Sequence, residues 1–446
     1  MKFLIIGGDA AGMSAAMQIK RRDPNVEITV LEKGKNTSYG ACGIPYYFTG
    51  DVTSLDSLVV VTPEEFNKKG INVLINHEAL KIDTKNKKVL AKNFDNELEI
   101  NYDKLLIASG ASPIKPDFKN VNAKGIFTIK NLNDAHNLDE YLKNNIKKAV
   151  IVGAGYIGLE IAEALYKKGL EITIIEKLSG VMGNINEKVN ELVKKELESK
   201  NIKLLLDTGV LGFESLDDKV SSVLTEKENI STDLVILSLG VKPNTSFLKD
   251  SGIELGISGA IKVNEYLETN VEDVFSAGDC AESFHRVLRK NVFIPLALTA
   301  NRQGRIAGAN MVEKNEVFAG VLGSAATKIF DLAIARTGLD ENLAKKENIP
   351  FKTVENIAGS KAHYYQGHKP VYIKLLYHSE NYKVLGAILV GKDESLSKRS
   401  DIIATAISAG MTIKELSELD LSYAPPFSPV WDPILQVANK GVFSIK

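Results

Sequence analysis

Thiols are scarce in this sequence, which has only two cysteines, Cys42 and Cys280, among 446 residues. Their wide separation excludes a disulfide framework and the close cysteine spacings of zinc sites. Few thiols without a disulfide framework are typical of the reducing cytoplasm, where we expect this protein. A lone cysteine can be a metal ligand, half of a disulfide, a nucleophile or a small buried side chain, so its neighbours must decide.

The sequence also lacks the features of membrane and nucleic-acid-binding proteins. No apolar run approaches the roughly 18 residues of a membrane-spanning helix, so we expect no membrane attachment. The net charge is only −1, with Lys and Glu interspersed, which indicates no nucleic-acid surface. With 44% hydrophobic residues in 446, the chain is long enough for two or three domains.

Glycine-rich loops are present, and the first opens the chain. Residues 2–8 are an apolar strand that runs into glycine, Gly12 follows, and a helix is predicted over 13–22. A second strand over 26–31 ends in Glu32. This acid stands about 20 residues after the last glycine, the spacing at which a carboxylate accepts the ribose hydroxyls of an adenosine.

The same plan returns from residue 148. Strands are predicted over 148–152 and 171–175, with a helix over 159–168 between them and Glu176 at the end. The three fingerprint glycines are Gly153, Gly155 and Gly158. In the first copy Asp9 stands where the middle glycine belongs, and the adjacent Gly8 takes its place in our interpretation. One such fingerprint is a weak signal, but two copies in this register predict two Rossmann-like, dinucleotide-binding domains.

A third segment resembles the second flavin-binding motif of the two-dinucleotide-binding-domain flavoproteins. Residues 269–279 are a short predicted strand closed by Gly-Asp, and Asp279 matches the aspartate that contacts the ribityl chain of FAD in that family. The family's connecting strands are matched by 105–110 and 235–240. Residues 295–304 resemble the helix start that faces the pyrimidine edge of the flavin. The resemblance implies FAD on the first copy and a nicotinamide nucleotide on the second.

The second copy also bears on the choice of nicotinamide nucleotide. Glu176 favours NADH over NADPH, because a carboxylate repels a 2′-phosphate. Lys177 either softens that preference or faces water. Tyr156 and Glu160 match residues that gate and orient the nicotinamide in the resembled family.

Together these motifs assign two sets of cofactor residues. For FAD they are Gly7, Gly8, Asp9, Ala10, Ala11, Gly12, Glu32, Lys33, Ser109, Gly110, Asp279, Pro295, Leu296, Ala297 and Thr299. For the nicotinamide nucleotide they are Gly153, Gly155, Tyr156, Ile157, Gly158, Glu160, Glu176, Lys177 and Gly240.

Cys42 stands in the stretch Ser-Tyr-Gly-Ala-Cys-Gly-Ile-Pro-Tyr-Tyr, residues 38–47. The glutathione-reductase branch uses two nearby cysteines and a C-terminal His-Glu pair, but here Cys42 has no near partner and no histidine follows His378. The partner sulfur is then a substrate thiol or a persulfide, or the cysteine forms a sulfenic acid. Each route needs a thiolate near neutral pH, and we expect the site to supply one.

This stretch and Tyr-Ala-Pro-Pro-Phe-Ser at 423–428 resemble the coenzyme A disulfide reductase branch of the FAD-dependent pyridine nucleotide-disulfide oxidoreductases. That branch also contains NADH oxidases, NADH peroxidases and NAD(P)H sulfur or persulfide reductases. The resemblance implies an α/β fold of two Rossmann-like domains with an α+β C-terminal dimerisation domain. The expected boundaries are 1–112 and 246–320 for the FAD domain, 113–245 for the NAD(P)H domain and 321–446 for the dimerisation domain.

Within the branch, two sets of positions indicate the reaction. Peroxidase and oxidase members carry a histidine where Ala10 stands, and alanine transfers no proton. Disulfide reductases use tyrosines contributed across the dimer, matched here by Tyr423 and by Tyr365 or Tyr364, although packing in an interface would also account for them. We expect a homodimer that reduces the disulfide, persulfide or polysulfide of a small thiol, above all coenzyme A. The alternatives are an NADH oxidase or peroxidase acting through a sulfenic acid, and a flavoprotein electron donor or redox sensor.

Coenzyme A would need a site for its 3′-phospho-ADP. The positions that contact it in the resembled reductases are Ser14, Gln18, Arg21, Ser38 and Lys69. The basic run at 20–22 fits either this anion or a solvated helix end. Ala41 departs from the asparagine common before the cysteine in those enzymes. Cys280 is expected to open a helix and to be structural.

Overall fold

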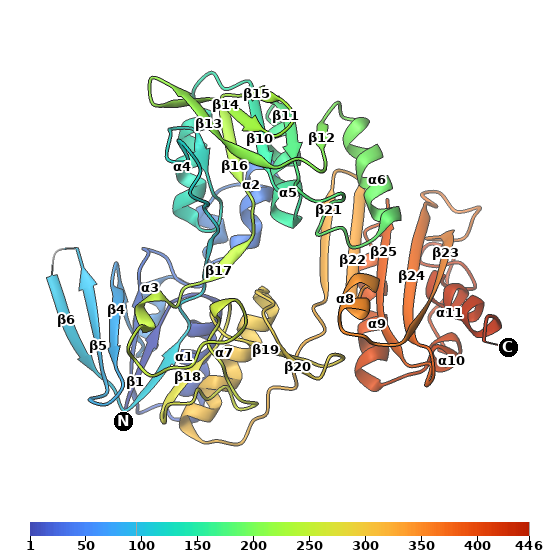
Figure 1. Cartoon of the computed structure of the whole chain (residues 1–446). Helices are drawn as coiled ribbons and strands as arrows, with labels where there is room; N and C mark the ends of the chain where they lie inside the picture. The colour runs from blue at the N-terminus through green and yellow to red at the C-terminus, as the bar shows by residue number, and fades with distance from the viewer. Residues whose placement is uncertain (95, 446) are drawn as a thin grey trace.

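The computed structural model describes residues 1–94 and 96–445, which form three bodies around separate sheets (Figure 1). The first sheet is parallel, in the order β18-β7-β1-β2-β3. Its strands are β1 (Lys2–Ile6), β2 (Glu27–Glu32), β3 (Asn72–Ile75), β7 (Lys104–Ile107) and β18 (Val274–Ser276). Since β18 joins strands from the first quarter of the chain, the chain leaves this body and later returns to it.

A second parallel sheet repeats the plan in the order β12-β11-β10-β16-β9. Its strands are β9 (Ile126–Phe127), β10 (Lys148–Val152), β11 (Glu171–Ile175), β12 (Lys203–Leu205) and β16 (Leu234–Leu237). The three inner strands, β10, β11 and β16, are almost wholly buried, as expected for a parallel sheet covered on both faces. The predicted Rossmann-like repeat is therefore confirmed.

Each repeat places a helix directly after its glycine loop. These helices are α1 (Ala10–Arg22) and α5 (Tyr156–Lys167), and both begin three residues before the predicted starts. The reason is that the last fingerprint glycine, Gly12 or Gly158, lies inside the first helical turn rather than in the loop before it. Helix α7 (Ala297–Val312) packs along α1. A Cβ on Gly304 would lie 2.1 Å from the carbonyl oxygen of Ala11, so the two helix backbones touch.

The third body is an antiparallel sheet in the order β21-β22-β25-β24-β23, covered by helices. Its strands are β21 (Ala325–Ile329), β22 (Leu332–Gly338), β23 (Phe351–Gly359), β24 (Pro370–His378) and β25 (Val384–Gly391). Its helices are α8 (Glu341–Lys346), α9 (Leu396–Ala409), α10 (Ile413–Ser417) and α11 (Pro433–Phe443). Helices α9, α10 and α11 share one hydrophobic core with the sheet.

The remaining elements connect or extend these bodies. The helices are α2 (Ile44–Thr49), α3 (Pro63–Lys68), α4 (Leu132–Leu142) and α6 (Glu187–Glu198). Two small sheets have three strands each. The first has the order β4 (Glu78–Asp83), β5 (Lys88–Asn93), β6 (Asn96–Asn101), and the second has the order β13 (Val210–Leu216), β14 (Lys219–Thr225), β15 (Asn229–Ser231). Two strand pairs complete the fold: β8 (Ala111–Pro113) with β17 (Val241–Pro243), and β19 (Ser283–His285) with β20 (Lys290–Val292).

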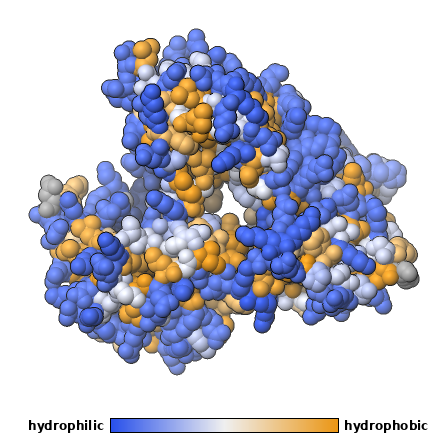
Figure 2. Space-filling model, in the orientation of Figure 1, coloured by the Kyte–Doolittle hydropathy of each residue, from blue (hydrophilic) through white to orange (hydrophobic). Residues whose placement is uncertain are grey.

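Glutamates of the second body hold it against the third. Lys392 lies 2.7 Å from a carboxylate oxygen of Glu196 on α6, and the backbone N–H of Phe330 donates to Glu163 on α5 at 2.6 Å. Figure 2 shows a mostly hydrophilic face that is hollowed where the three bodies meet, with apolar residues at the rim. Within the described ranges, no helix is both long and apolar enough to cross a membrane.

The prediction that a helix starts at Cys280 is wrong. Cys280 lies in a turn between β18 and β19 and is fully buried. Its thiol lies 3.4 Å from the carbonyl oxygen of Ile107 and 3.6 Å from the hydroxyl of Ser276. Cys280 packs into the core beside the first sheet, and the chain leads from this turn into β19 instead of a helix.

Candidate active site

The two glycine loops have the same backbone geometry. Gly7 and Gly153 both have φ +106°, a conformation that favours glycine. A Cβ on either would overlap the carbonyl oxygen of Ala108 or Ser238, at 2.1 and 2.3 Å. Each loop thus runs against the neighbouring strand with no room for a side chain. The backbone N–H groups at the start of each helix are left to face a ligand, as a dinucleotide pyrophosphate requires.

The acids at the ends of β2 and β11 are held in matching ways. Each carboxylate accepts one N–H from its own glycine loop and one from the residue two positions further along the chain. The bonds are Gly8 N–H to Glu32 at 2.7 Å, Gly34 N–H to Glu32 at 2.6 Å, Ala154 N–H to Glu176 at 2.8 Å and Leu178 N–H to Glu176 at 2.9 Å. Burial raises the pKa of Glu32, and the two backbone N–H groups oppose the shift. Two such cradles fit two dinucleotides.

The other residues predicted for the flavin lie around the first loop. Gly278 packs on it, since a Cβ there would lie 2.9 Å from that of Ala11. Leu296 caps the start of α7, with Ala297 exposed and Thr299 buried. Lys33 is exposed and forms an ion pair with Glu78 at 2.8 Å. Ser109 and Gly110 lie where the chain passes between the first two bodies, and the backbone carbonyl oxygen of Ser109 accepts a 2.9 Å hydrogen bond from the Asn244 side-chain amide. Gly240, which was predicted for the nicotinamide nucleotide, lies at the same crossing, and its carbonyl oxygen accepts a 2.9 Å hydrogen bond from Ile114 N–H.

Cys42 lies in a short 3₁₀ turn, Ala41–Gly43, that leads into α2. The N–H of Gly40 donates to the carbonyl oxygen of Leu58 at 2.8 Å, and a Cβ on Gly43 would lie 2.3 Å from Cδ2 of Leu58. Because Gly40 and Gly43 have no side chains, the turn that holds Cys42 can pack directly against Leu58. The Cys42 side chain is exposed, whereas Cys280 is buried, so Cys42 is the thiol that a substrate can reach.

The chain's own residues mostly oppose the Cys42 thiolate that the sequence leads us to expect. Desolvation by the surrounding protein raises the pKa of Cys42, and the Glu160 carboxylate raises it further. Asp279 and Asp9 act in the same direction, while the Lys130 ammonium lowers the pKa. Lys130 is thus a cation that favours the thiolate.

Lys130 was not predicted from the sequence. It stands directly before the capped start of α4, and its Nζ lies 2.9 Å from Oδ2 of Asp279, the predicted ribityl aspartate. Nothing local distinguishes this lysine from the many solvated ones, and only the tertiary structure brings it to the thiol. Burial raises the pKa of Asp9 in the same region to about 6, against a hydrogen bond from the Tyr39 backbone.

Glu160 is one turn into α5, beyond the nicotinamide fingerprint. Its carboxylate accepts a 2.7 Å hydrogen bond from the Thr327 hydroxyl on β21. Burial raises the pKa of Glu160, and the Thr327 bond lowers it. Tyr156, at the start of α5, is half-buried, while its neighbour Ile157 is exposed. Lys177 is exposed, in agreement with the interpretation that it faces water.

The predicted tyrosines lie together in the third body. Tyr364, Tyr365 and Tyr423 are 68%, 40% and 46% exposed. A hydrogen bond with Tyr364 raises the pKa of Tyr423, so the two tyrosines act on each other. Across the described residues, no hydrogen bond or ion pair joins these tyrosines to Cys42, so the structure does not bring the two groups together within one chain.

The residues predicted for coenzyme A lie at the first body's surface. Ser14, Gln18 and Arg21 share one face of α1, because they are spaced by four and three residues. Ser14 donates to Asn301 at 2.8 Å. Ser38 has φ +46° and donates its N–H to Gly8, while Lys69 is exposed beside the Phe66 ring.

The three basic residues at the end of α1, residues 20–22, have different partners. Lys20 donates to the carbonyl oxygens of Pro24 and Val26, and Arg22 pairs with Glu316. Arg21 is the exposed member. Lys20 and Arg22 are therefore engaged by other residues of the chain rather than solvated, and Arg21 is the member of the run left for an anion.

Two parallel repeats with nucleotide cradles, an exposed thiol beside them and an appended antiparallel sheet define a dinucleotide-dependent thiol oxidoreductase. Family comparison agrees: residues 1–304 match the pyridine nucleotide-disulphide oxidoreductase model, and residues 324–433 match that family's dimerisation domain. The chain belongs to the pyridine nucleotide-disulphide oxidoreductase family. Membership implies FAD and NAD(P)H as cofactors, and the predicted α/β fold with a C-terminal dimerisation domain is confirmed.

Individual relatives fall in the predicted branch. The chain is 38% identical over 441 residues to the NAD(P)H coenzyme A polysulfide/persulfide reductase of Pyrococcus horikoshii, covering 98% of both chains. It is 34% identical over 449 residues to an NADH oxidase of Methanocaldococcus jannaschii, covering 99% of both. A solved NAD-dependent persulfide reductase from A. fulgidus superposes with a TM-score of 0.96 at 38% identity, over all of this chain and 83% of the other.

Proposed function

We propose that this protein is an NAD(P)H-dependent reductase of the sulfur–sulfur bond in a coenzyme A disulfide, persulfide or polysulfide, with Cys42 as its redox thiol. The observation that carries the proposal is the isolation of Cys42. Cys42 is exposed and is influenced by charges from both repeats, Asp9 and Glu160, while Cys280, the other cysteine, is buried. The second sulfur of any redox pair at Cys42 must therefore belong to the substrate.

The residues divide the chemistry as follows. The Cys42 thiolate attacks one sulfur of coenzyme A disulfide, the S–S bond breaks, and a Cys42–coenzyme A mixed disulfide forms while the other coenzyme A leaves as a thiolate. The Tyr423 phenol, supported by Tyr364 or Tyr365, donates the proton that this leaving thiolate takes. Bound FAD supplies the two electrons from NAD(P)H that split the mixed disulfide and restore the Cys42 thiolate.

The overall stoichiometry can be written for the disulfide and for the persulfide. One NAD(P)H, one proton and one coenzyme A disulfide give NAD(P)⁺ and two coenzyme A thiols. With coenzyme A persulfide the products are NAD(P)⁺, one coenzyme A thiol and hydrogen sulfide.

We place FAD on the first cradle, in a domain of residues 1–112 and 246–320, and the nicotinamide nucleotide on the second, in residues 113–245. The matching cradles and the Lys130–Asp279 pair support this assignment. The dimerisation domain, 321–446, would bring the exposed tyrosines of one subunit to Cys42 of its partner. Ser14, Gln18, Arg21, Ser38 and Lys69 would hold coenzyme A, with Arg21 as the anion contact. The cytoplasm remains our predicted location.

Mass spectrometry of the purified protein tests the proposal. We expect Cys42 to carry coenzyme A or an added sulfur after mixing with substrate, and NADH to release it. Cys42→Ser should keep FAD and its reduction by NADH but lose reduction of the sulfur–sulfur bond. Full turnover in Cys42→Ser would refute the role of the thiol. Oxygen consumption far above persulfide turnover would instead support the NADH oxidase alternative, which Ala10 disfavours because alanine transfers no proton.

A further inference from the structure

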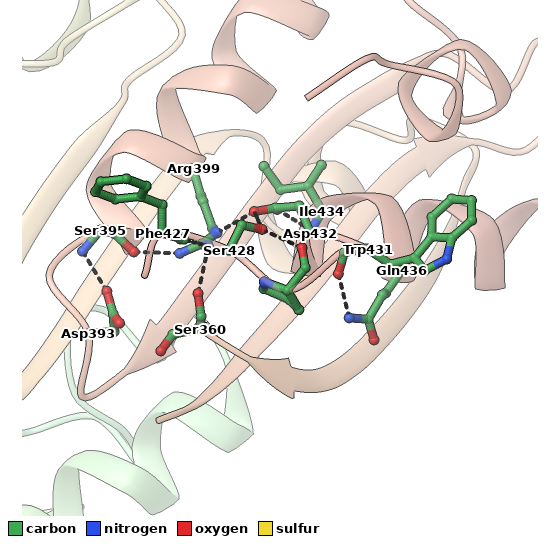
Figure 3. A network of polar contacts seen from close by, with 11 residues as sticks. Ser360, Asp393, Ser395, Arg399, Phe427, Ser428, Trp431, Asp432, Ile434 and Gln436 are labelled. Atoms are coloured by element: carbon green, nitrogen blue, oxygen red, sulfur yellow. Dashed lines mark hydrogen bonds and ion pairs between the residues drawn. The ribbon is translucent and has the colours of Figure 1, made fainter. Parts of the chain in front are cut away.

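A buried arginine lies behind the two loops that carry the tyrosines. Arg399, on α9, is only 4% exposed. Its Nε donates to Oδ2 of Asp432 at 2.9 Å, and its Nη2 donates to the carbonyl oxygens of Ser360 at 2.9 Å and Phe427 at 3.3 Å (Figure 3). Its Nη1 donates to the Ser395 hydroxyl. One guanidinium therefore uses all three of its nitrogens on partners from four separate points of the chain.

Two of these partners belong to the loops that carry the tyrosines. Ser360 opens the first tyrosine loop, residues 360–369, which holds Tyr364 and Tyr365. The loop is closed at its base by Ser360 N–H donating to the carbonyl oxygen of Lys369 at 2.8 Å. Phe427 lies in the second tyrosine loop, residues 418–432, four positions after Tyr423. Arg399 Nη2 therefore bridges the two loops directly.

Asp432 extends the bridge to the end of the second loop. Its Oδ2 also accepts from the Ser428 hydroxyl at 3.0 Å, and its Oδ1 caps α11 by accepting from Ile434 N–H at 2.9 Å. The loops also meet directly, where Ala362 N–H donates to the Pro425 carbonyl at 3.3 Å. The contacts of Arg399 and Asp432 thus tie both loops to helices α9 and α11, while the tyrosines themselves stay exposed.

Stability alone is a poor reason for this arrangement. Replacing a buried ion pair by apolar side chains is often neutral or stabilising, because both charges lose their hydration. What a planar guanidinium supplies, and an apolar side chain or an ammonium does not, is several donors in a fixed geometry. We therefore expect Arg399 to contribute mainly by holding its acceptors, and the loops that carry them, in fixed positions.

We propose that Arg399 is a positioning residue that sets the two tyrosine loops relative to each other, so that the Tyr423–Tyr364 pair meets the leaving thiolate. The inference rests on the proposed function for the role of the tyrosines. The loop placement itself can be measured without any turnover.

The test uses Arg399→Lys in the FAD-loaded protein, with Lys374→Met as the matched control. Lys374, on β24, is likewise a partly buried cation of the third body. Its ion pairs are with Glu341 on α8 at 2.6 Å and with Glu355 on β23 at 3.8 Å, so neither pair involves a tyrosine loop. Hydrogen–deuterium exchange is followed at residues 360–369 and 418–432. Rapid mixing then measures flavin reduction by NADH and flavin reoxidation by coenzyme A persulfide as separate half-reactions.

We expect Arg399→Lys to speed exchange in both loops and to slow reoxidation about 10- to 100-fold, with flavin reduction unchanged. In a Tyr423→Phe background the same substitution should cost no further rate, since it acts through that phenol. Lys374→Met should change neither loop nor either half-reaction.

Three results would overturn the inference: unchanged exchange in both loops, an equal loss in both half-reactions, or losses from Arg399→Lys and Tyr423→Phe that multiply. If Arg399→Lys folds poorly, the same measurements can be made on Asp432→Asn, which removes the charge of the Arg399 partner and keeps the side chain's size. A failure of the proposed function is separable, because it shows as retained turnover in Cys42→Ser and leaves the exchange result intact.

Discussion

The Thr327 hydroxyl donates a 2.7 Å hydrogen bond to Oε1 of Glu160, and this bond joins the nicotinamide fingerprint helix α5 to the first strand of the third body. It also controls a charge that acts on Cys42. The bond lowers the pKa of Glu160, against the rise caused by burial, and so favours the carboxylate that opposes the thiolate. A residue outside both nucleotide cradles therefore reaches the redox thiol through one acid.

Thr327→Val tests this link. Loss of the hydroxyl should raise the pKa of Glu160, so that Glu160 is neutral up to higher pH and repels the Cys42 thiolate less. The rate of Cys42 alkylation in the reduced enzyme should then rise at the pH values where Glu160 titrates, since only there do the two proteins differ in the charge of this acid. The lost hydrogen bond should cost about 1 kcal/mol of unfolding free energy. Thr353→Val on the exposed side of β23 serves as the control, and an alkylation profile that moves equally in both variants would argue against the link.

Substitutions of Glu160 and Lys130 should move Cys42 in opposite directions. Glu160 raises the pKa of Cys42, so Glu160→Gln lowers it and speeds alkylation below that pKa; Lys130 lowers it, so Lys130→Met slows alkylation. For partly exposed charges we expect changes of about two- to fivefold in rate. The comparison is made at one pH in low salt and again in high salt, where both effects should shrink. Changes of the same sign in the two variants would contradict this electrostatic account.

Two glycines separate packing from ligand binding. A Cβ on Gly304 would collide with the Ala11 backbone at 2.1 Å, so Gly304→Ala should cost about 1–3 kcal/mol of unfolding free energy and lower the bound FAD. A Cβ on Gly155 meets nothing within 4 Å in the protein. Gly155→Ala should keep stability and FAD but weaken NADH binding about tenfold, because the pyrophosphate approaches the backbone there. Thermal unfolding, flavin content and NADH titration distinguish the two, and unchanged NADH affinity in Gly155→Ala would contradict the placement.

Nucleotide preference should depend on Glu176 rather than Lys177. The Glu176 carboxylate is fixed by the N–H groups of Ala154 and Leu178, whereas Lys177 is exposed. Glu176→Ala should raise the ratio of kcat/KM for NADPH over NADH about tenfold, by removing the charge that repels the 2′-phosphate. Lys177→Ala should change that ratio less than about twofold. Steady-state kinetics with both nucleotides provides the check, and a larger change in Lys177→Ala would reverse the assignment.

The sequence predicted the repeated architecture because its signals are local. A strand, a glycine loop and an acid at fixed spacing are read within about 30 residues, and Gly7 and Gly153 indeed share one backbone conformation. Helix starts were misplaced by three residues because Gly12 and Gly158 look like loop residues but lie in the first turn. Lys130 and Thr327 were missed because their partners, Asp279 and Glu160, are 149 and 167 positions away.

Charge around Cys42 was the harder property to predict. The residues around Cys42 in the sequence say nothing of the electrostatic field at the sulfur. That field is the sum of Glu160, Lys130, Asp279 and Asp9, which come from four separate segments. Desolvation, its largest contribution, depends on the packing of the whole site and has no local sequence signal.

The tyrosine pair gives the last prediction. The hydrogen bond with Tyr364 raises the pKa of Tyr423, so Tyr423 stays protonated throughout the neutral range and can donate to a leaving thiolate. Tyr423→Phe should slow reoxidation of the reduced enzyme by coenzyme A disulfide on the order of a hundredfold, because the phenol supplies the proton. Tyr364→Phe should have a smaller effect, since it removes only the partner of that phenol. Reduction of the flavin by NADH, measured in the same rapid-mixing experiment, should be unchanged in both. If the loss vanishes with a substrate whose leaving thiol has a low pKa, proton donation is the role of Tyr423; a loss independent of the leaving group would indicate that Tyr423 serves in packing instead.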